Sequence, residues 1–178
     1  MRVRDTAIPG MKVLTPARHE DERGFFTESW SRARLGEHGI DVDFVQDNHS
    51  FSARPGTVRG LHFQRPPHVQ VKLVWVVTGS LVDVVVDLRR GSPTRGAWRS
   101  VEVSARLGNQ VLVPAGCAHG FCTLEPATHV LYKVDAPWAP EAEAGIRWDD
   151  PELAIEWPEL DPLRISEKDR SLPSWSQL

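Results

Sequence analysis

Cysteine is scarce in this chain of 178 residues, and long apolar runs are absent. The two cysteines, Cys117 and Cys122, are too few for a disulfide scaffold and have no metal-binding partners at short spacing. No apolar run reaches the ~18–20 residues of a membrane span, and the N-terminal residues lack the apolar core of a signal peptide. The sequence therefore predicts a soluble, cytoplasmic protein.

An excess of positive charge is also lacking. The 21 basic residues are outnumbered by 24 acidic residues, which gives a formal net charge of −3. This balance excludes a general attraction to nucleic acid or to anionic membranes, so any anion must be bound by local groups. Only four basic residues are lysines, namely Lys12, Lys72, Lys133 and Lys168. Because lysine and arginine differ chemically, each lysine is a candidate for a specific role.

Length and composition predict one globular domain. The chain is within the range of roughly 100–200 residues for a domain and long enough to bury its own core. Hydrophobic residues make up 40% of it, and the 13 glycines bring the apolar share into the globular range. We therefore expect residues 1–178 to form a single domain.

The 14 prolines are spread along the chain, which favours many short strands over a few long elements. The tail over residues 148–178 is expected to pack over a β core. Together these features predict an all-β, antiparallel fold. Strands are expected at 44–49, 98–103, 110–113 and 129–134, and short helical turns at 29–35 and 162–168.

The clearest β pattern covers residues 69–88, where two β-branched runs flank a turn that contains Gly79. This pattern predicts a β-hairpin. In the first run, Lys72 shares one face with Val74 and Val76, so that face is polar at one end and apolar at the other. Such a face suits the mouth of a barrel or sandwich with an apolar floor.

The segment Arg59-Gly60-Leu61-His62-Phe63-Gln64 contains a histidine whose role the spacing leaves open. His62 could line the core, bind a metal or act as a general base. A metal-binding cupin is expected to have two histidines separated by one residue. Here Gln64 stands two residues after His62, and the next histidine is His68, so a compact ligand cluster is missing. The spacing therefore argues against a metal.

Three more segments carry reactive side chains, each ambiguous when taken alone. His119 is flanked by small residues, which let a ligand approach the backbone closely. Tyr132 is within an expected strand, where a tyrosine is more often a core residue with a satisfied hydroxyl. The segment at 21–26, followed by Glu28, has the composition of a charged turn that enters a strand.

In chain order, these segments resemble the dTDP-4-dehydrorhamnose 3,5-epimerase family, which includes deoxysugar relatives that act only at C3 or only at C5. The resemblance extends over about residues 11–169. It implies a cupin-like antiparallel jelly roll with short helical segments, a homodimer, no cofactor or metal, and a dTDP-linked 4-keto-6-deoxyhexose as substrate. The matching segments are DERGFF at 21–26, QDNHS at 46–50, VRGLHFQ at 58–64, QVKL at 70–73, PAGCAHGF at 114–121, YK at 132–133, EAEAGIRWDDP at 141–151 and SEKD at 166–169.

The resemblance also implies catalytic roles. A C4 ketone acidifies the hydrogens on C3 and C5, so a base can remove one and an acid on the opposite face can return a proton with inverted configuration. By the match, His62 is the base, Asp169 supports its imidazole and Tyr132 is the acid. Lys72 is expected near the C4 oxygen, where an ammonium stabilises the enolate.

A larger set of substrate contacts follows from the same match. Arg23, Arg59 and Lys168 correspond to contacts with the diphosphate and the nucleotide. Trp138 stands where the family commonly carries a tyrosine, and this departure puts the second epimerisation in doubt and favours an antibiotic deoxysugar over rhamnose. The other expected substrate contacts are Phe26, Glu28, Gln46, Asn48, His119 and Glu143.

Other functions remain open from the sequence alone. One is a 3-only or 5-only epimerase of a modified deoxysugar. A second is a metal-dependent cupin oxygenase or isomerase, against which the missing histidine cluster argues. A third is a sugar-nucleotide binder without activity, against which the retention of all four expected catalytic residues argues. No nucleic acid or membrane partner is expected.

Overall fold

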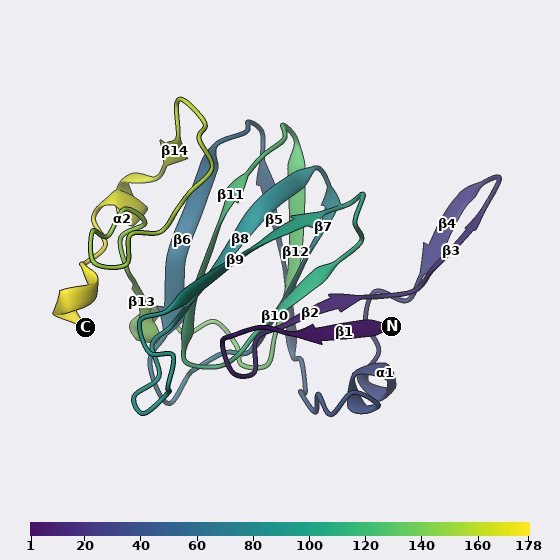
Figure 1. Cartoon of the computed structure of the whole chain (residues 1–178), viewed down its shortest axis with the longest axis horizontal. Helices are drawn as coiled ribbons and strands as arrows, with labels where there is room; N and C mark the ends of the chain where they lie inside the picture. Colours follow the sequence, from purple (N-terminus) through teal and green to yellow (C-terminus); the bar gives the residue numbers. More distant parts are fainter.

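The computed structural model describes residues 1–178 and contains two antiparallel sheets packed face to face, with a separate two-stranded hairpin that projects from the body (Figure 1). This is the cupin-like jelly roll that the resemblance implies. The first sheet has the order β1 (Arg2–Asp5), β2 (Lys12–Thr15), β10 (Gln110–Val113), β7 (Lys72–Thr78), β12 (Thr128–Val134) and β5 (Gln46–Ser52). The second sheet has the order β13 (Glu143–Gly145), β6 (Thr57–Gln64), β11 (Cys117–Thr123), β8 (Ser80–Asp87) and β9 (Trp98–Ser104).

Only short elements accompany the two sheets. β14 (Arg164–Ile165) pairs in parallel with β6, and β3 (Arg18–Asp21) with β4 (Gly24–Thr27) forms the projecting hairpin. No helix is long and apolar enough to cross a membrane. The helical elements are α1 (Arg32–Gly36), α2 (Glu167–Arg170) and the 3-10 turns Pro140–Ala142 and Trp175–Gln177.

The main core is between the two sheets and confirms the predicted faces of β7. Val74 and Val76 are buried there against residues of the second sheet such as Val85 and Phe121. Lys72, on the same face of β7, lines a cavity at the end of the sandwich. The strand thus supplies both the apolar floor and a charged group at the mouth.

The predicted hairpin over residues 69–88 is wrong, although both strands exist. β7 pairs with β10 and β12 in the first sheet, whereas β8 pairs with β11 and β9 in the second. The chain crosses between the sheets at Gly79, whose φ is +83° and where a Cβ would lie 2.4 Å from Thr128 Oγ1. Two β-branched runs around a glycine are equally compatible with a hairpin and with a crossover, because local alternation does not specify pairing.

The other predicted strands are largely confirmed, with β5 shifted by two residues toward the C-terminus at its start. β6 and β11 were not predicted as strands, since glycines and histidines interrupt their apolar alternation. Their glycines allow close pairing: a Cβ on Gly60 would lie 2.7 Å from Gly120 Cα. These two unpredicted strands carry both histidines of the site described below.

The C-terminal tail packs over the β core as predicted. Leu153 and partly buried aromatic residues, including Trp157 and Trp175, cover the outer face of the second sheet. Trp98 on β9 donates a hydrogen bond from Nε1 to the Leu153 carbonyl at 2.9 Å. This packing holds α2 against β6.

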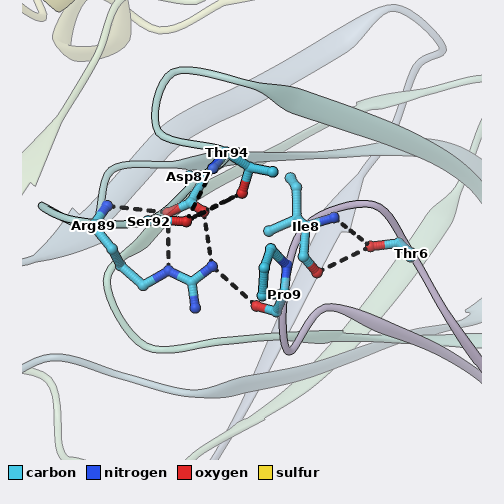
Figure 2. Close-up of polar contacts among 7 residues, drawn as sticks. All are labelled: Thr6, Ile8, Pro9, Asp87, Arg89, Ser92 and Thr94. Atoms are coloured by element: carbon cyan, nitrogen blue, oxygen red, sulfur yellow. Dashed lines mark hydrogen bonds and ion pairs between the residues drawn. The ribbon is translucent and has the colours of Figure 1, made fainter.

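At the end of β8, the fully buried carboxylate of Asp87 organises the following loop (Figure 2). Its Oδ1 accepts from Arg89 Nε at 2.9 Å, and its Oδ2 accepts from Arg89 Nη2, Ser92 Oγ and Thr94 Oγ1 at 2.6–2.8 Å. Arg89 Nη2 also donates to the Pro9 carbonyl at 2.9 Å, which ties the loop to the N-terminal segment. Burial by itself raises the pKa of Asp87, but these hydrogen bonds outweigh it and place the pKa well below its usual range.

We expect Asp87→Asn to lower the free energy of unfolding by about 2–4 kcal/mol near neutral pH, because it removes a buried charge with several charge-assisted hydrogen bonds. The folded-state pKa is depressed, so this stability is present above the unfolded pKa of about 3.9 and is lost as pH falls below it. Urea unfolding of both proteins between about pH 7 and pH 3 measures the difference. Asp5→Asn, which breaks an exposed pair with Lys12, is the control and should cost at most about 1 kcal/mol. A difference that does not shrink with acidification would contradict this account.

Candidate functional site

The candidate site is a cleft at the polar end of the sandwich, formed by two cavities of about 560 and 400 Å³. Three side chains line both cavities, namely His62 on β6, Lys72 on β7 and Tyr132 on β12. His62 comes from the second sheet, whereas Lys72 and Tyr132 come from the first. The cleft therefore presents a histidine on one wall and a tyrosine on the other.

His62 is hydrogen-bonded to Asp169 of α2, with a distance of 2.7 Å from Nε2 to Oδ1. The Gly60 N–H donates to the other carboxylate oxygen at 3.2 Å, and the Asp169 side chain is only 6% exposed. Burial raises the pKa of Asp169, but its hydrogen bonds, above all the one with His62, outweigh burial, so the pKa is lowered. The ionised carboxylate favours the imidazole tautomer with its proton on Nε2, which leaves the Nδ1 lone pair free to accept a proton.

Lys72 and Tyr132 have shifted pKa values because both are withdrawn from water. Burial lowers the pKa of Lys72 to about 8, although the carboxylates of Asp83 and Glu143 oppose that shift. Burial raises the pKa of Tyr132, with Arg59 opposing the rise and Glu143 adding to it. At neutral pH the ammonium is therefore present and the phenol keeps its proton. One can stabilise an anion, and the other can donate a proton.

A second histidine–carboxylate pair lies beside the first. His119 on β11 is opposite His62 in the β6–β11 register, and its Nε2 is 2.7 Å from Oδ2 of Asp83 on β8. Asp83 is fully buried, and its Oδ1 has no hydrogen-bond partner. Sequence reasoning missed Asp83, although a lone carboxylate within the apolar run Leu81–Val86 was a usable signal. No group of three or more His, Cys, Asp or Glu side chains is arranged to hold a metal ion.

The first cavity is bordered by cationic side chains. Arg59 lines it and donates from Nη2 to the Phe51 carbonyl at 3.0 Å. Arg164 of β14 was not predicted from the sequence; it lines the same cavity and donates to two backbone carbonyls. Neither guanidinium is within ion-pair distance of a carboxylate, so both retain donors for an anion. Lys168 also lines this cavity and is paired with Glu143 at 2.8 Å.

The second cavity collects four of the remaining predicted contacts, namely Gln46, Asn48, Trp138 and Glu143. Gln46 Nε2 donates to Asn48 Oδ1 at 2.8 Å, and the Trp138 backbone N–H donates to Gln46 Oε1 at 3.2 Å. Trp138 is 59% exposed. An aromatic surface thus stands beside a row of amide groups, which suits a planar polar ligand.

Three predicted contacts lie outside the cleft. Arg23 and Phe26 belong to the β3–β4 hairpin, which extends away from both sheets (Figure 1), and Glu28 follows it directly. Arg23 is paired with Asp21, and Glu28 Oε1 is 3.6 Å from Arg34 Nε. None of the three lines either cavity of the cleft.

Comparison with known proteins identifies close relatives along the whole chain. A family model described as dTDP-4-dehydrorhamnose 3,5-epimerase matches residues 5–177. The dTDP-4-dehydrorhamnose 3,5-epimerase of Sinorhizobium fredii is 47% identical over 178 residues, covering 100% of this chain and 91% of the relative. The Bacillus anthracis enzyme of the same name, solved with TDP and PPi bound, superposes with a TM-score of 0.95 at 48% identity, covering 97% and 98% of the two chains. NovW, a 4-keto-6-deoxy sugar epimerase from the novobiocin gene cluster of Streptomyces spheroides, has a TM-score of 0.94 at 36% identity, covering 99% and 88%.

Proposed function

The chain belongs to the dTDP-4-dehydrorhamnose 3,5-epimerase family of isomerases, and on this premise we propose that it inverts C3 and C5 of a dTDP-linked 4-keto-6-deoxyhexose. The observation that carries the proposal is the His62–Asp169 pair facing the same cleft as Tyr132, which comes from the opposite sheet. Inversion needs a base and an acid on two faces of the sugar, and a histidine and a tyrosine on opposite walls support that assignment.

The first chemical step is removal of a proton from carbon. The free Nδ1 of His62 takes the hydrogen from C3 or C5, and the electron pair moves into an enolate with its charge on the C4 oxygen. Asp169 stabilises the imidazolium that forms, because an ionised carboxylate at hydrogen-bond distance favours the charged ring. This role is consistent with the lowered pKa of Asp169.

The enolate needs a positively charged partner whose interaction with the C4 oxygen becomes stronger as negative charge develops there. Lys72 supplies an ammonium in a site largely withdrawn from water, where a charge interacts more strongly than it does in solvent. It stabilises the enolate oxygen more than the neutral ketone. The activation free energy therefore falls, because the transition state is stabilised more than the bound substrate. His119, held by Asp83, contacts the sugar from the wall of the cleft that also carries His62.

Return of a proton completes the inversion. Tyr132 donates its phenolic proton to the face of the enolate opposite to the base, and its raised pKa keeps that proton available at neutral pH. One proton leaves the sugar for His62 and one arrives from Tyr132, so each inversion is balanced. His62 then releases its proton to water and Tyr132 takes one up, which restores the starting protonation states. The substrate's diphosphate is held by Arg59, Arg164 and Lys168.

We also propose a homodimer in which the β3–β4 hairpin brings Arg23, Phe26 and Glu28 to the cleft of the partner. Two observations support this. The hairpin projects from the body, and its Phe25 and Phe26 are 57% and 71% exposed, which is costly for a surface that meets only water. The family resemblance assigns Arg23, Phe26 and Glu28 to the ligand, yet they line no cavity of the cleft in their own chain.

The reaction is tested by solvent deuterium exchange in chelator-treated protein without added nicotinamide. We expect solvent deuterium to enter both C3 and C5 of dTDP-4-keto-6-deoxyglucose. Mass spectrometry and NMR measure this incorporation. His62→Ala should slow exchange by about 10²–10⁴-fold, because it removes the base. Tyr132→Phe should slow inversion more than exchange, since His62 can still remove a proton and return deuterium to the same face.

His68→Ala is the matched control, because His68 lies outside the cleft lining, and it should exchange like the wild type. Exchange at one carbon only would replace the proposal with a 3-only or 5-only epimerase. Binding of the sugar nucleotide without exchange at either carbon would make the protein a binder. Activity that disappears with the chelator and returns with a metal would favour the metal-dependent alternative.

The pH dependence tests Lys72. The ammonium is the active form and its pKa is about 8, so kcat/KM should fall as pH rises through about 8. Glu143→Gln removes a carboxylate that favours the ammonium, so this alkaline limb should move to lower pH. Glu141→Gln changes a neighbouring carboxylate that is directed at His68, and it should leave the limb in place. A limb that Glu143→Gln does not move would exclude Lys72 as its source.

The shared cleft is tested by complementation between two inactive variants. Co-expressed Arg23→Ala and His62→Ala chains should recover up to about a quarter of wild-type activity, because random pairing of two chains makes half of the dimers mixed and each has one intact cleft. Co-expressed His62→Ala and Tyr132→Phe chains should not recover activity. Both residues belong to the cleft of one chain, so every cleft in a mixed dimer lacks one of them. Activity equal to the sum of the separate variants in the first mixture would contradict the exchange of hairpins.

A further inference from the structure

A third cavity, of about 600 Å³, lies outside the catalytic cleft where β6, the loop after β8 and the C-terminal tail meet. Its apolar lining includes Phe63, Val69, Leu88, Trp175 and Leu178. Its polar lining includes four arginines, namely Arg65, Arg89, Arg90 and Arg95, and no Asp or Glu side chain. We call this site the arginine-rimmed cavity.

Most of this positive charge has no protein partner. Asp87 neutralises Arg89, but no carboxylate is within ion-pair distance of Arg65, Arg90 or Arg95. The Arg95 guanidinium lies 4.9 Å from the centroid of the Trp175 ring, which orients it without compensating its charge. Like charges gathered at one cavity repel one another, and an anion bound among them would offset that repulsion. This is the local concentration of positive charge that the net charge of −3 conceals.

The loop that carries Arg90 and Arg95 is held in place before any ligand arrives. The Asp87 carboxylate binds Arg89, Ser92 and Thr94 together (Figure 2). The Gly96 N–H donates to the Asp87 carbonyl at 2.8 Å, which closes the loop. Such ordering lowers the entropic cost of binding, because the arginine backbones need not be fixed by the ligand.

We propose that the arginine-rimmed cavity binds a nucleotide, as a second site separate from the catalytic cleft. Guanidinium groups match phosphate oxygens in geometry and charge, so the rim takes the phosphates. The apolar floor takes the base and the sugar ring, in a volume typical of small-molecule sites. Phe63 and Gln64 line both this cavity and the catalytic cleft, so the two sites share one end of β6.

The test counts bound dTDP per chain by equilibrium dialysis. Arg65→Gln/Arg90→Gln should bind one dTDP per chain fewer than the wild type, because each lost charge-assisted contact weakens binding about tenfold. Arg95 is left unchanged in this variant, so that Trp175 keeps its packing. Arg2→Gln/Arg4→Gln, which removes two exposed arginines of β1, is the charge-matched control and should bind as much dTDP as the wild type. Circular dichroism checks that all variants are folded.

Two results would overturn the proposal. One is an unchanged amount of bound dTDP in Arg65→Gln/Arg90→Gln. The other is an affinity of inorganic pyrophosphate for this cavity that equals the affinity of dTDP in a competition experiment. The apolar floor would then contribute nothing to nucleotide binding. Arg59→Gln distinguishes the two sites. It should abolish dTDP binding in the catalytic cleft and leave dTDP binding in the arginine-rimmed cavity unchanged.

Discussion

A positively charged side chain at the end of an apolar sandwich is the constraint on which the rest of this structure depends. Lys72 shares its strand face with Val74 and Val76, so one strand must place an ammonium beside the core. The charges of Asp83 and Glu143 favour the ammonium against the cost of its burial, and the cavity leaves this end of the sandwich open. The other groups of the cleft line the walls of that same opening.

The two-sheet architecture places the His62–Asp169 pair and the Tyr132 phenol on opposite walls of the cleft. An acid and a base on one wall would both address the same face of a bound sugar, and a proton returned there would not invert the carbon. Tyr132 is instead mounted on the opposite sheet, and strands paired on both sides hold each wall rigidly. The separation of His62 from Tyr132 is thus set by how the two sheets pack against each other.

Sequence reasoning succeeded where the signal is local. The alternation in β7 and the bounds of β10 are set by residues within a few positions, and both are confirmed. The partners of β7 and β8 depend on long-range packing, so the predicted hairpin was wrong. The grouping of His62, Lys72, Tyr132 and Asp169 around one cleft came from the family resemblance, because spacing alone left His62 ambiguous. Asp83 was missed although its carboxylate interrupts an apolar run, because the sequence does not show that β8 lies beside β11 and His119.

The contact between His62 and Asp169 joins residues that are 107 positions apart in the chain. A ribosome that adds about 5–20 residues per second therefore needs roughly 5–20 s between the synthesis of the imidazole and that of its carboxylate. During this interval the nascent chain holds a histidine without its partner, and α2 has yet to dock on β6. All the strands of both sheets precede α2 in the chain, so His62 gains its carboxylate partner only after every strand has been synthesised.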